Sequence, residues 1–389
     1  MPPIFSIIVP CYRLRERRWI VEQCITSIAH QTFRDYELLL VDDGSSDGTP
    51  ELLRQMVARD PVLSSRGRVL ALPENGGVCA ARNAGIDAAR GDYVAFLDCD
   101  DMWQRQYLAC IHGAAVCHPS TEVFLARTDF MRTLGGELRV RSSGPLGHLN
   151  ALTDTGFKAW HFLHSFPVAM GSAVVVARRL YLEHPELKFD MALSRTTAED
   201  VLFGMLLLAT GIRPWYVDEP LCVHRRILET VSRGQAAFFW IDEREVNDYI
   251  SLRAADAIER EIIAQQPELQ PQLRAVRERL NLAFDLKREY RSASHWFGLR
   301  TCLRSPRGFK TLVRLHGTAL LIGGPFEFIL RQYFLRSGGD DADARARVRS
   351  LLKTLQATQA HDTTATAARS ASGVNPERVG LQSAHEQTR

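Results

Sequence analysis

The chain has 389 residues, of which 46% are hydrophobic and 24% charged, as in an ordinary globular protein that can bury a substantial core. Its 48 Lys and Arg residues nearly balance 45 Asp and Glu, and this net charge of +3 argues against a nucleic-acid partner. Eight cysteines form neither a CxxC pair nor a dense framework, which favours reduced thiols in the cytoplasm and excludes a disulfide scaffold.

The first half of the chain alternates between strand and helix patterns. Short apolar runs predict strands at Ile4–Val9, Tyr36–Val41, Arg68–Leu72 and Tyr93–Leu97. Helical spacing or helix-start residues predict helices at Trp19–His30, from Thr49 onward and at Val78–Ala89. Apolar strands separated by helices indicate an α/β layer whose mostly parallel sheet is buried on both faces.

The alternation loosens after a helix predicted at Tyr107–Cys117. Further strands are predicted at Val123–Ala126, Ala173–Ala177, Trp215–Val217 and Leu221–Val223, the last two on either side of Pro220. The segment Glu199–Ala209 is apolar nearly all round, so it predicts a buried helix that stops at Gly211.

The C-terminal part differs from this α/β domain, which we expect at residues 1–232. Residues 233–337 are predicted to be helical and basic, and residues 338–389 a largely disordered tail with room for a short helix at Ala344–Leu355. Residues 287–336 hold ten basic and two acidic side chains, interleaved with apolar ones. Two interpretations stay open: peripheral contact with an anionic membrane surface, or a packed subdomain with solvated cations.

No leader or membrane-spanning helix is expected. The start of the chain lacks a basic region ahead of its short apolar run. The most apolar long segment, residues 315–334, is interrupted by Pro325, Glu327 and Arg331, whereas about 20 uncharged residues are needed to span a bilayer.

Polar residues follow each of the first four predicted strands. These tips are Pro10 to Arg13, Asp42 to Thr49, Pro73 to Gly77 and Asp98 to Asp101. In an open parallel sheet, ligands bind beyond the carboxyl ends of the strands, so we expect the tips to share one rim.

The fourth tip carries closely spaced acids. Asp98 and Asp100 stand at alternate positions, from which two carboxylates reach a common hard cation such as Mg²⁺ or Mn²⁺. The alternative is a strand end followed by a helix near Met102, with Asp101 as its N-cap. That alternative leaves Asp98 and Asp100 unexplained.

The other tips have simple alternatives of their own. Asp42 and its neighbours fit a turn, or a carboxylate that accepts the N3–H of a pyrimidine base while Tyr12 covers the ring. By itself, Asn75 fits a turn and Arg82 a solvated helix residue.

Taken together, the tips resemble a known family. The segments 6–13, 41–49, 75–85 and 91–101, in this order and spacing, resemble the N-terminal half of a family 2 glycosyltransferase of the GT-A fold. The similarity continues more loosely through Gly171-Ser172 and Thr197–Asp200. The resemblance implies a GT-A-type α/β domain that uses a nucleotide-diphosphate sugar, inverts the anomeric centre and usually needs Mn²⁺ or Mg²⁺.

The resemblance also implies roles for individual residues. It assigns Asp200 as the catalytic base, with Glu199 beside it to orient the acceptor or cap the helix. It assigns Asp100, Asp98 and His224 to the metal. To the nucleotide sugar it assigns Pro10, Tyr12, Arg13, Asp42, Asn75, Arg82, Asp98 and Gly171. Arg13 stands where asparagine is usual, and residues 134–166 match no pattern, which leaves the acceptor open.

Asp200 has a structural alternative, because Thr197 to Asp200 also forms a capping box. The acids precede a helix that must be buried, which brings them to the edge of the core. Together with the other motifs, this favours the base over the cap.

The expected function is the transfer of a sugar, with inversion, to a hydroxyl of a saccharide or lipid-linked saccharide. The expected donor is a UDP-sugar. The expected setting is bacterial surface-polysaccharide synthesis, in the cytoplasm or peripherally on the inner membrane face. One alternative is a nucleotide-sugar-binding scaffold without turnover. A nucleotidyltransferase is disfavoured, because Pro10 to Arg13 stand where a phosphate-binding loop is expected.

Overall fold

The computed structural model describes residues 2–134, 137–143, 145–152, 171–191, 199–200, 203–204, 207, 211–226, 263–264, 267–271 and 341–371. The predicted alternation is present in its first part. Its strands are β1 (Phe5–Cys11), β2 (Tyr36–Asp42), β3 (Gly67–Ala71) and β4 (Tyr93–Phe96). Between them lie the turn η1 (Arg15–Arg17) and the helices α1 (Arg18–Ala29), α2 (Thr49–Arg59) and α3 (Val78–Ala88). These strands pair in parallel, in the order β3-β2-β1-β4.

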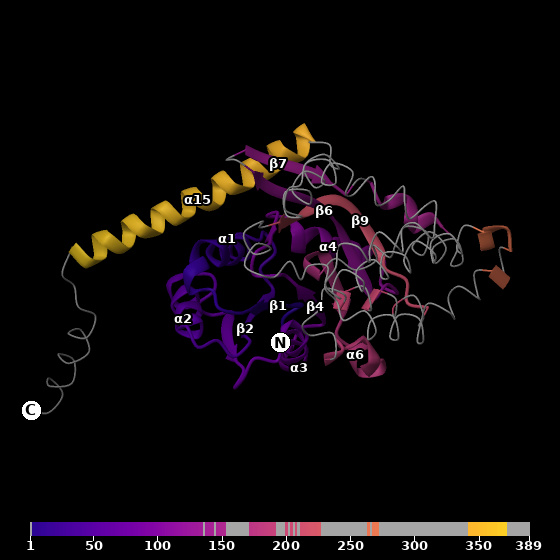
Figure 1. The fold of residues 1–389 in the computed structure, drawn as a ribbon, viewed down its shortest axis with the longest axis horizontal. Helices are drawn as coiled ribbons and strands as arrows, with labels where there is room; N and C mark the ends of the chain where they lie inside the picture. The colour runs from indigo at the N-terminus through magenta and orange to yellow at the C-terminus, as the bar shows by residue number, and fades with distance from the viewer. Residues whose placement is uncertain are drawn as a thin grey trace, which may run out of the picture.

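The second part extends the same sheet. It contributes β5 (Met102–Trp103), α4 (Tyr107–Cys117), β6 (Val123–Leu134), β7 (Glu137–Ser142), β8 (Val174–Ala177) and β9 (Trp215–Arg226). The sheet of the described residues has nine strands, continuing from β4 as β8-β6-β9-β5, with β7 paired to β6. Figure 1 shows β6, β7 and β9 in this second part. Pairing here is antiparallel except between β6 and β9. The predicted α/β fold is confirmed, with a sheet that is parallel at its start and mixed beyond β4.

Short elements complete the described part of the chain. They are η2 (Gly147–Ala151), η3 (Gly171–Ala173), α6 (Leu180–Glu183), η4 (Pro185–Leu187) and η8 (Pro267–Leu269). Of these, η3 matters most for the site, because it lies beside the end of β4 and enters β8 directly.

One prediction is wrong because it divides a single strand into two. Trp215–Val217 and Leu221–Val223 are not two strands but parts of β9, which continues through Pro220 to Arg226. The register with β6 shifts on either side of Arg127, which is paired with Pro220. Proline lacks a ladder donor, and a local irregularity in the pairing lets the strand continue past it.

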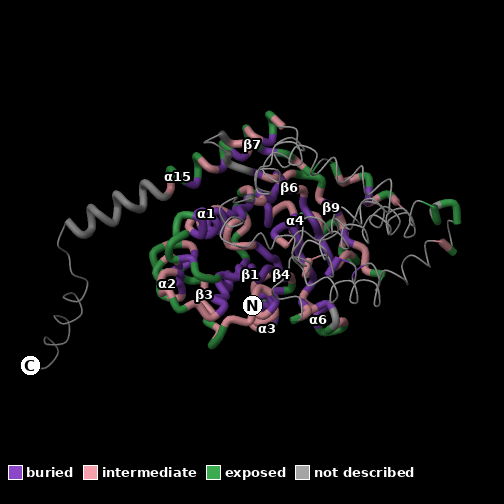
Figure 2. The backbone as a smooth tube through the Cα atoms, viewed as in Figure 1, coloured by how far each residue is buried: buried purple, intermediate pink, exposed green. Residues whose placement is uncertain are grey.

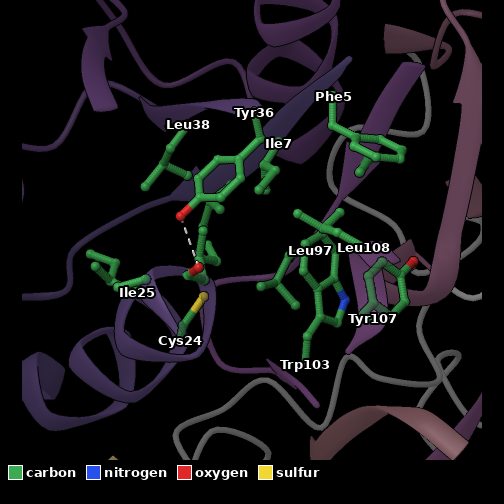
Figure 3. Packing of buried hydrophobic residues seen from close by; sticks show 14 of the residues in the cluster. Phe5, Ile7, Cys24, Ile25, Tyr36, Leu38, Leu97, Trp103, Tyr107 and Leu108 are labelled. Carbon is green, nitrogen blue, oxygen red and sulfur yellow. Dashed lines mark hydrogen bonds between the residues drawn. The ribbon is translucent and has the colours of Figure 1, made fainter. Parts of the chain in front are cut away.

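The strands of the sheet are largely buried, as their purple colour in Figure 2 shows, and the core lies on both faces of the sheet. Alternate residues of β1 enter opposite clusters: Ile8 packs with Leu39 on one face, and Ile7 with Leu38 on the other. On the second face, the Trp103 ring stacks on that of Tyr107 with centroids 4.1 Å apart. The Tyr36 hydroxyl there donates to the carbonyl of Ile28 at 3.0 Å (Figure 3).

The C-terminal helix α15 (Ala342–Ala371) is long and lies across α1 and β7 (Figure 1). Residues 342–371 of the predicted tail are thus helical, over a longer stretch than the short helix expected at Ala344–Leu355. A stripe of small and apolar side chains at helical spacing packs against Met102, Met131, Val140 and Val223; its members are Ala344, Val348, Leu351 and Leu355. The pairing of Arg347 with the buried Asp129 at 3.1 Å adds an ion pair to this contact.

Several predictions fall on residues outside the described ranges. These are most of 233–337, including the basic segment 287–336, the boundary at 232, and residues 372–389. Within the described ranges, none of the helices combines the length and the apolar composition that crossing a bilayer requires.

Candidate active site

The ends of β1 and β2 form the first wall of the site. Pro10 and Cys11 are paired with Val41 and Asp42 in the parallel register. Beyond the strands, the Arg13 amide donates to Ser45 Oγ at 2.9 Å, and the Arg13 guanidinium lies 5.3 Å from the ring of Tyr12. Arg13 has φ +50°, a conformation that non-glycine residues rarely adopt. This turn leaves the Tyr12 side chain 41% exposed at the rim.

Asp42 has one carboxylate oxygen in use and one without a partner. Its Oδ2 accepts a hydrogen bond from the Ser45 amide at 2.9 Å, whereas Oδ1 is buried and finds no donor among the described residues. A buried acceptor without a donor is unfavourable, so Oδ1 is a candidate acceptor for an N–H group of a ligand.

The neighbouring Asp43 shapes the next loop. Its carboxylate accepts hydrogen bonds from Asn75 Nδ2 at 2.8 Å and from the amides of Gly76 and Gly77 at 2.9 and 2.8 Å. Asn75, predicted to bind the nucleotide sugar, therefore directs its side-chain amide at Asp43 and holds the loop that leads into α3.

Arg82 links two acids that lie far apart in the sequence. This buried residue of α3 donates from Nη2 to Asp98 Oδ1 at 2.8 Å and from Nη1 to Glu199 Oε1 at 2.9 Å. Burial alone lowers the pKa of Arg82, but the charges of Asp98 and Glu199 outweigh it and raise that pKa above its usual value. The bridge brings the end of β4 together with Glu199, the residue before Asp200.

Gly171 lies against this bridge. A Cβ at this position would stand 3.1 Å from Arg82 Nη2 and 3.5 Å from Asp98 Oδ2. The predicted site residue Gly171 therefore lies with Arg82 and Asp98, and its lack of a side chain leaves room beside the Asp98 carboxylate.

Asp101 joins the other elements of the site. It is fully buried and accepts hydrogen bonds from Ser172 Oγ, from the Arg225 amide at 2.8 Å and from His224 Nδ1 at 3.0 Å. It caps no helix, because Met102 and Trp103 form β5 and the next helix begins at Tyr107. The capping alternative for Asp101 is thus wrong, since bonds to η3 and β9 fill its acceptor positions instead.

The three acids after β4 crowd negative charge around His224. Burial, followed by the charges of Asp101 and Asp98, raises the pKa of Asp100 to about 7. Burial alone lowers the pKa of His224, but Asp101, Asp100 and Asp98 outweigh it and raise that pKa to about 9. The predicted metal ligands Asp98, Asp100 and His224 thus lie in one cluster that attracts positive charge.

The same cluster is already engaged by protein groups. Arg82 pairs with Asp98, and Asp101 with His224. Across the parts of the chain that the structure describes, no three His, Cys, Asp or Glu side chains are arranged as a ready metal-binding group.

Glu199 and Asp200 are helical and half-buried, and the buried Phe203 and Leu207 follow them. Their helix therefore enters the core as predicted. Glu199 Oε1 is bonded to Arg82, whereas Oε2 is buried without a hydrogen-bond partner in the described structure. Thr197, the hydroxyl of the proposed capping box, lies outside the described residues.

Sequence reasoning missed the bonding roles of Asp43, Asp101 and Ser172. Asp43 and Asp101 each follow an acid that was predicted to bind a ligand, Asp42 and Asp100, and Ser172 follows the predicted site residue Gly171. Only their partners distinguish them, and those partners come from other elements.

Comparison with known proteins gives related sequences. Residues 6–115 match the family model described as Glycosyl transferase family 2. The chain is 25% identical over 252 residues to the putative teichuronic acid biosynthesis glycosyltransferase TuaG of Bacillus subtilis (strain 168), covering 63% of this chain and 88% of that protein. It is 31% identical over 211 residues to the succinoglycan biosynthesis protein ExoO of Rhizobium meliloti (strain 1021), covering 54% and 57%. The family match spans the segments that supply the strand-end side chains.

Among solved structures, TarS 1–349 of S. aureus in complex with UDP-GlcNAc aligns with a TM-score of 0.48 at 20% identity. That alignment covers 71% of this chain and 79% of the TarS chain.

Proposed function

Because the chain is a family 2 glycosyltransferase, with its family domain at residues 6–115, we propose that it moves a sugar from a UDP-sugar to an acceptor hydroxyl. The acceptor is a saccharide or lipid-linked saccharide of bacterial surface-polysaccharide synthesis. The observation that carries the proposal is the Arg82 bridge, which joins Asp98 to Glu199, the residue before the proposed base Asp200. The names of TuaG and ExoO, which refer to teichuronic acid and succinoglycan biosynthesis, support the acceptor class.

The donor binds along the strand-end rim. Asp42 Oδ1, buried and without a donor in the described structure, accepts the N3–H of the uracil base, and the exposed Tyr12 ring covers it. Pro10 and Arg13 shape that wall, and Asp98 with Gly171 faces the ribose and sugar. Arg82 and Asn75 act here as positioning residues, since their side chains hold Asp98, Glu199 and Asp43.

Catalysis is a single displacement with inversion at the anomeric carbon. Asp200 accepts the proton of the acceptor hydroxyl while the hydroxyl oxygen attacks the anomeric carbon from the face opposite the nucleotide. Glu199, fixed by Arg82, orients the start of the helix that carries Asp200.

The proposal includes a divalent cation, Mn²⁺ or Mg²⁺, at the acid cluster. Burial, followed by the charges of Asp101 and Asp98, raises the pKa of Asp100, and a bound cation would favour its charged form, so Asp100, with Asp98 and His224, would hold the cation. His224 turns Nδ1 to Asp101, which leaves Nε2 as the nitrogen available to a metal. When bound, the metal neutralises charge on the leaving diphosphate.

The test compares the wild type with Asp200→Asn over a panel of nucleotide sugars and acceptors, measuring UDP release and donor binding. We expect the variant to bind the donor normally and to lose about a hundredfold or more in transfer. Glu51→Gln, at an exposed glutamate of α2, is the matched control. Full activity of Asp200→Asn would remove the base assignment, and release of no UDP by the wild type would favour a scaffold. Undiminished turnover in the presence of EDTA would refute the proposed metal requirement.

The proposal includes the domain boundaries, with catalysis in residues 1–232 and a helical, basic region at 233–337. The ten basic side chains of residues 287–336 support peripheral contact with the anionic inner face of the membrane. Sedimentation with anionic liposomes at low salt tests this contact, and its failure would favour a packed helical subdomain.

A further inference from the structure

Arg225 of β9 is a buried cation with incomplete hydrogen bonding. The residue is 6% exposed, and its Nη2 contacts Gln23 Oε1 at 2.6 Å and Met102 Sδ at 3.2 Å. Its Nε and Nη1 are buried and have no hydrogen-bond partner in the described structure. A buried guanidinium is stable when an anion completes its bonds, so these two N–H groups indicate an anionic ligand.

Trp19, in the first turn of α1, lies over this cation. Its ring is 5.2 Å from Arg225 Cζ, and the residue is 55% exposed, although tryptophan is usually well buried. An exposed aromatic face next to a cation suits a ligand that has one apolar face and one charged group.

The pair lies beside the proposed donor site, on the other face of β9 from His224. Successive side chains of a strand point to opposite faces. His224 faces Asp101, whereas the Arg225 side chain contacts Gln23 and Trp19 of α1 and stays within electrostatic range of Asp100 and Asp101. The Arg225 amide still donates to Asp101 Oδ1 at 2.8 Å, which keeps the pair close to the reacting groups.

Resting on the transferase function proposed above, we propose that Trp19 and Arg225 form an acceptor subsite for an acidic sugar. The Trp19 ring rotates away from the guanidinium and packs against the sugar. Nε and Nη1 of Arg225 then donate hydrogen bonds to the anionic oxygens of the sugar. The planar guanidinium matches the two oxygens of a carboxylate or phosphate. Rotation of an exposed side chain is fast, so opening the subsite adds no slow step.

The test uses the full chain saturated with UDP and Mn²⁺ and titrated calorimetrically with three probes. Methyl glucuronide supplies a carboxylate, glucose 6-phosphate a phosphate, and methyl glucoside is the neutral control. We expect one charged probe to bind at least about tenfold more tightly than the glucoside. The tighter of the two charged probes identifies the anionic group.

Variants connect this preference to the two residues. Arg225→Gln and Trp19→Ala are expected to remove the tenfold preference, whereas Arg225→Lys keeps part of it. Arg18→Gln is the matched control, because Arg18 is exposed on the same helix and pairs with Glu22. Since Trp19 is exposed, Trp19→Ala tests the subsite even where Arg225→Gln fails to fold.

Three results would overturn the subsite. One is equal or absent binding of charged and neutral probes, and another is a preference that survives Trp19→Ala. The third is loss of UDP affinity in Arg225→Gln with an unchanged charged-probe preference, which would assign Arg225 to the donor. UDP binding by the wild type is measured separately, and its absence would count against the proposed transferase and not against the subsite.

Discussion

Replacing Arg82 by methionine removes both ends of the Asp98–Arg82–Glu199 bridge and keeps much of the apolar volume of the side chain. Hydrogen bonds to charged groups contribute roughly 1.5–3 kcal/mol each when buried. Arg82 and Glu199 side chains are 3% and 11% exposed, whereas Asp98 is 31% exposed, so the Asp98 bond counts at the lower end. We therefore expect Arg82→Met to lower the free energy of unfolding by about 3 kcal/mol.

The measurement is urea unfolding at neutral pH, with Arg54→Met as control. Arg54 pairs with Glu51 through side chains that are 53% and 65% exposed, so its loss is expected to change stability by less than about 0.5 kcal/mol. In a double-mutant cycle, Glu199→Gln is expected to cost about 1.5 kcal/mol less in the Arg82→Met background than in the wild type.

The same variant separates positioning from nucleotide binding. Because both charged arms of Arg82 bind protein acids, we expect Arg82→Met to lose transfer activity and to keep UDP affinity within a few-fold. Additive effects of Arg82→Met and Glu199→Gln would refute the bridge. Unchanged stability together with loss of UDP binding would restore the direct nucleotide role that the sequence predicted.

Other predictions test the fold and the base site. Burial raises the pKa of Glu37, but hydrogen bonds from Ser6 and Arg90 outweigh it and hold that pKa below its usual 4.5. The contribution of Glu37 to stability is therefore present above about pH 4.5 and is lost as the pH falls through the lowered pKa. Glu37→Gln should lower the free energy of unfolding by about 2 kcal/mol at pH 7. In urea melts at a series of acidic pH values, the stability of this variant should depend less on pH than that of the wild type. Leu351→Ala in α15 should lower the free energy of unfolding by about 3 kcal/mol, whereas Lys353→Ala, at an exposed residue of the same helix, should leave it unchanged. Equal stability of the two variants would mean that α15 does not pack on the domain. Asp42→Asn should weaken UDP binding about tenfold in calorimetry, because an amide satisfies the uracil N3–H less well than a carboxylate; unchanged affinity would remove Asp42 from the base site.

Much of the fold was predictable because its signals are local. The helix at Tyr107–Cys117 was predicted with its observed bounds, and β1 to β4 lie within about two residues of their predicted positions. These elements are short apolar runs or amphipathic repeats, whose periodicity depends on near neighbours. The continuous β9 and the length of α15 were not predictable in this way, because each is stabilised by strands that are distant in the sequence.

The order of amino acids by itself determined the α/β alternation, the strand-end acids and the resemblance to a transferase family, since all of these are patterns of adjacent residues. Only the tertiary structure decided which partner each polar side chain meets. Arg82 turned to Asp98 and Glu199, Asn75 to Asp43, and Asp101 to His224. Acids with similar sequence surroundings differ in role because burial and opposing charge come from elements that only the folded chain brings into contact.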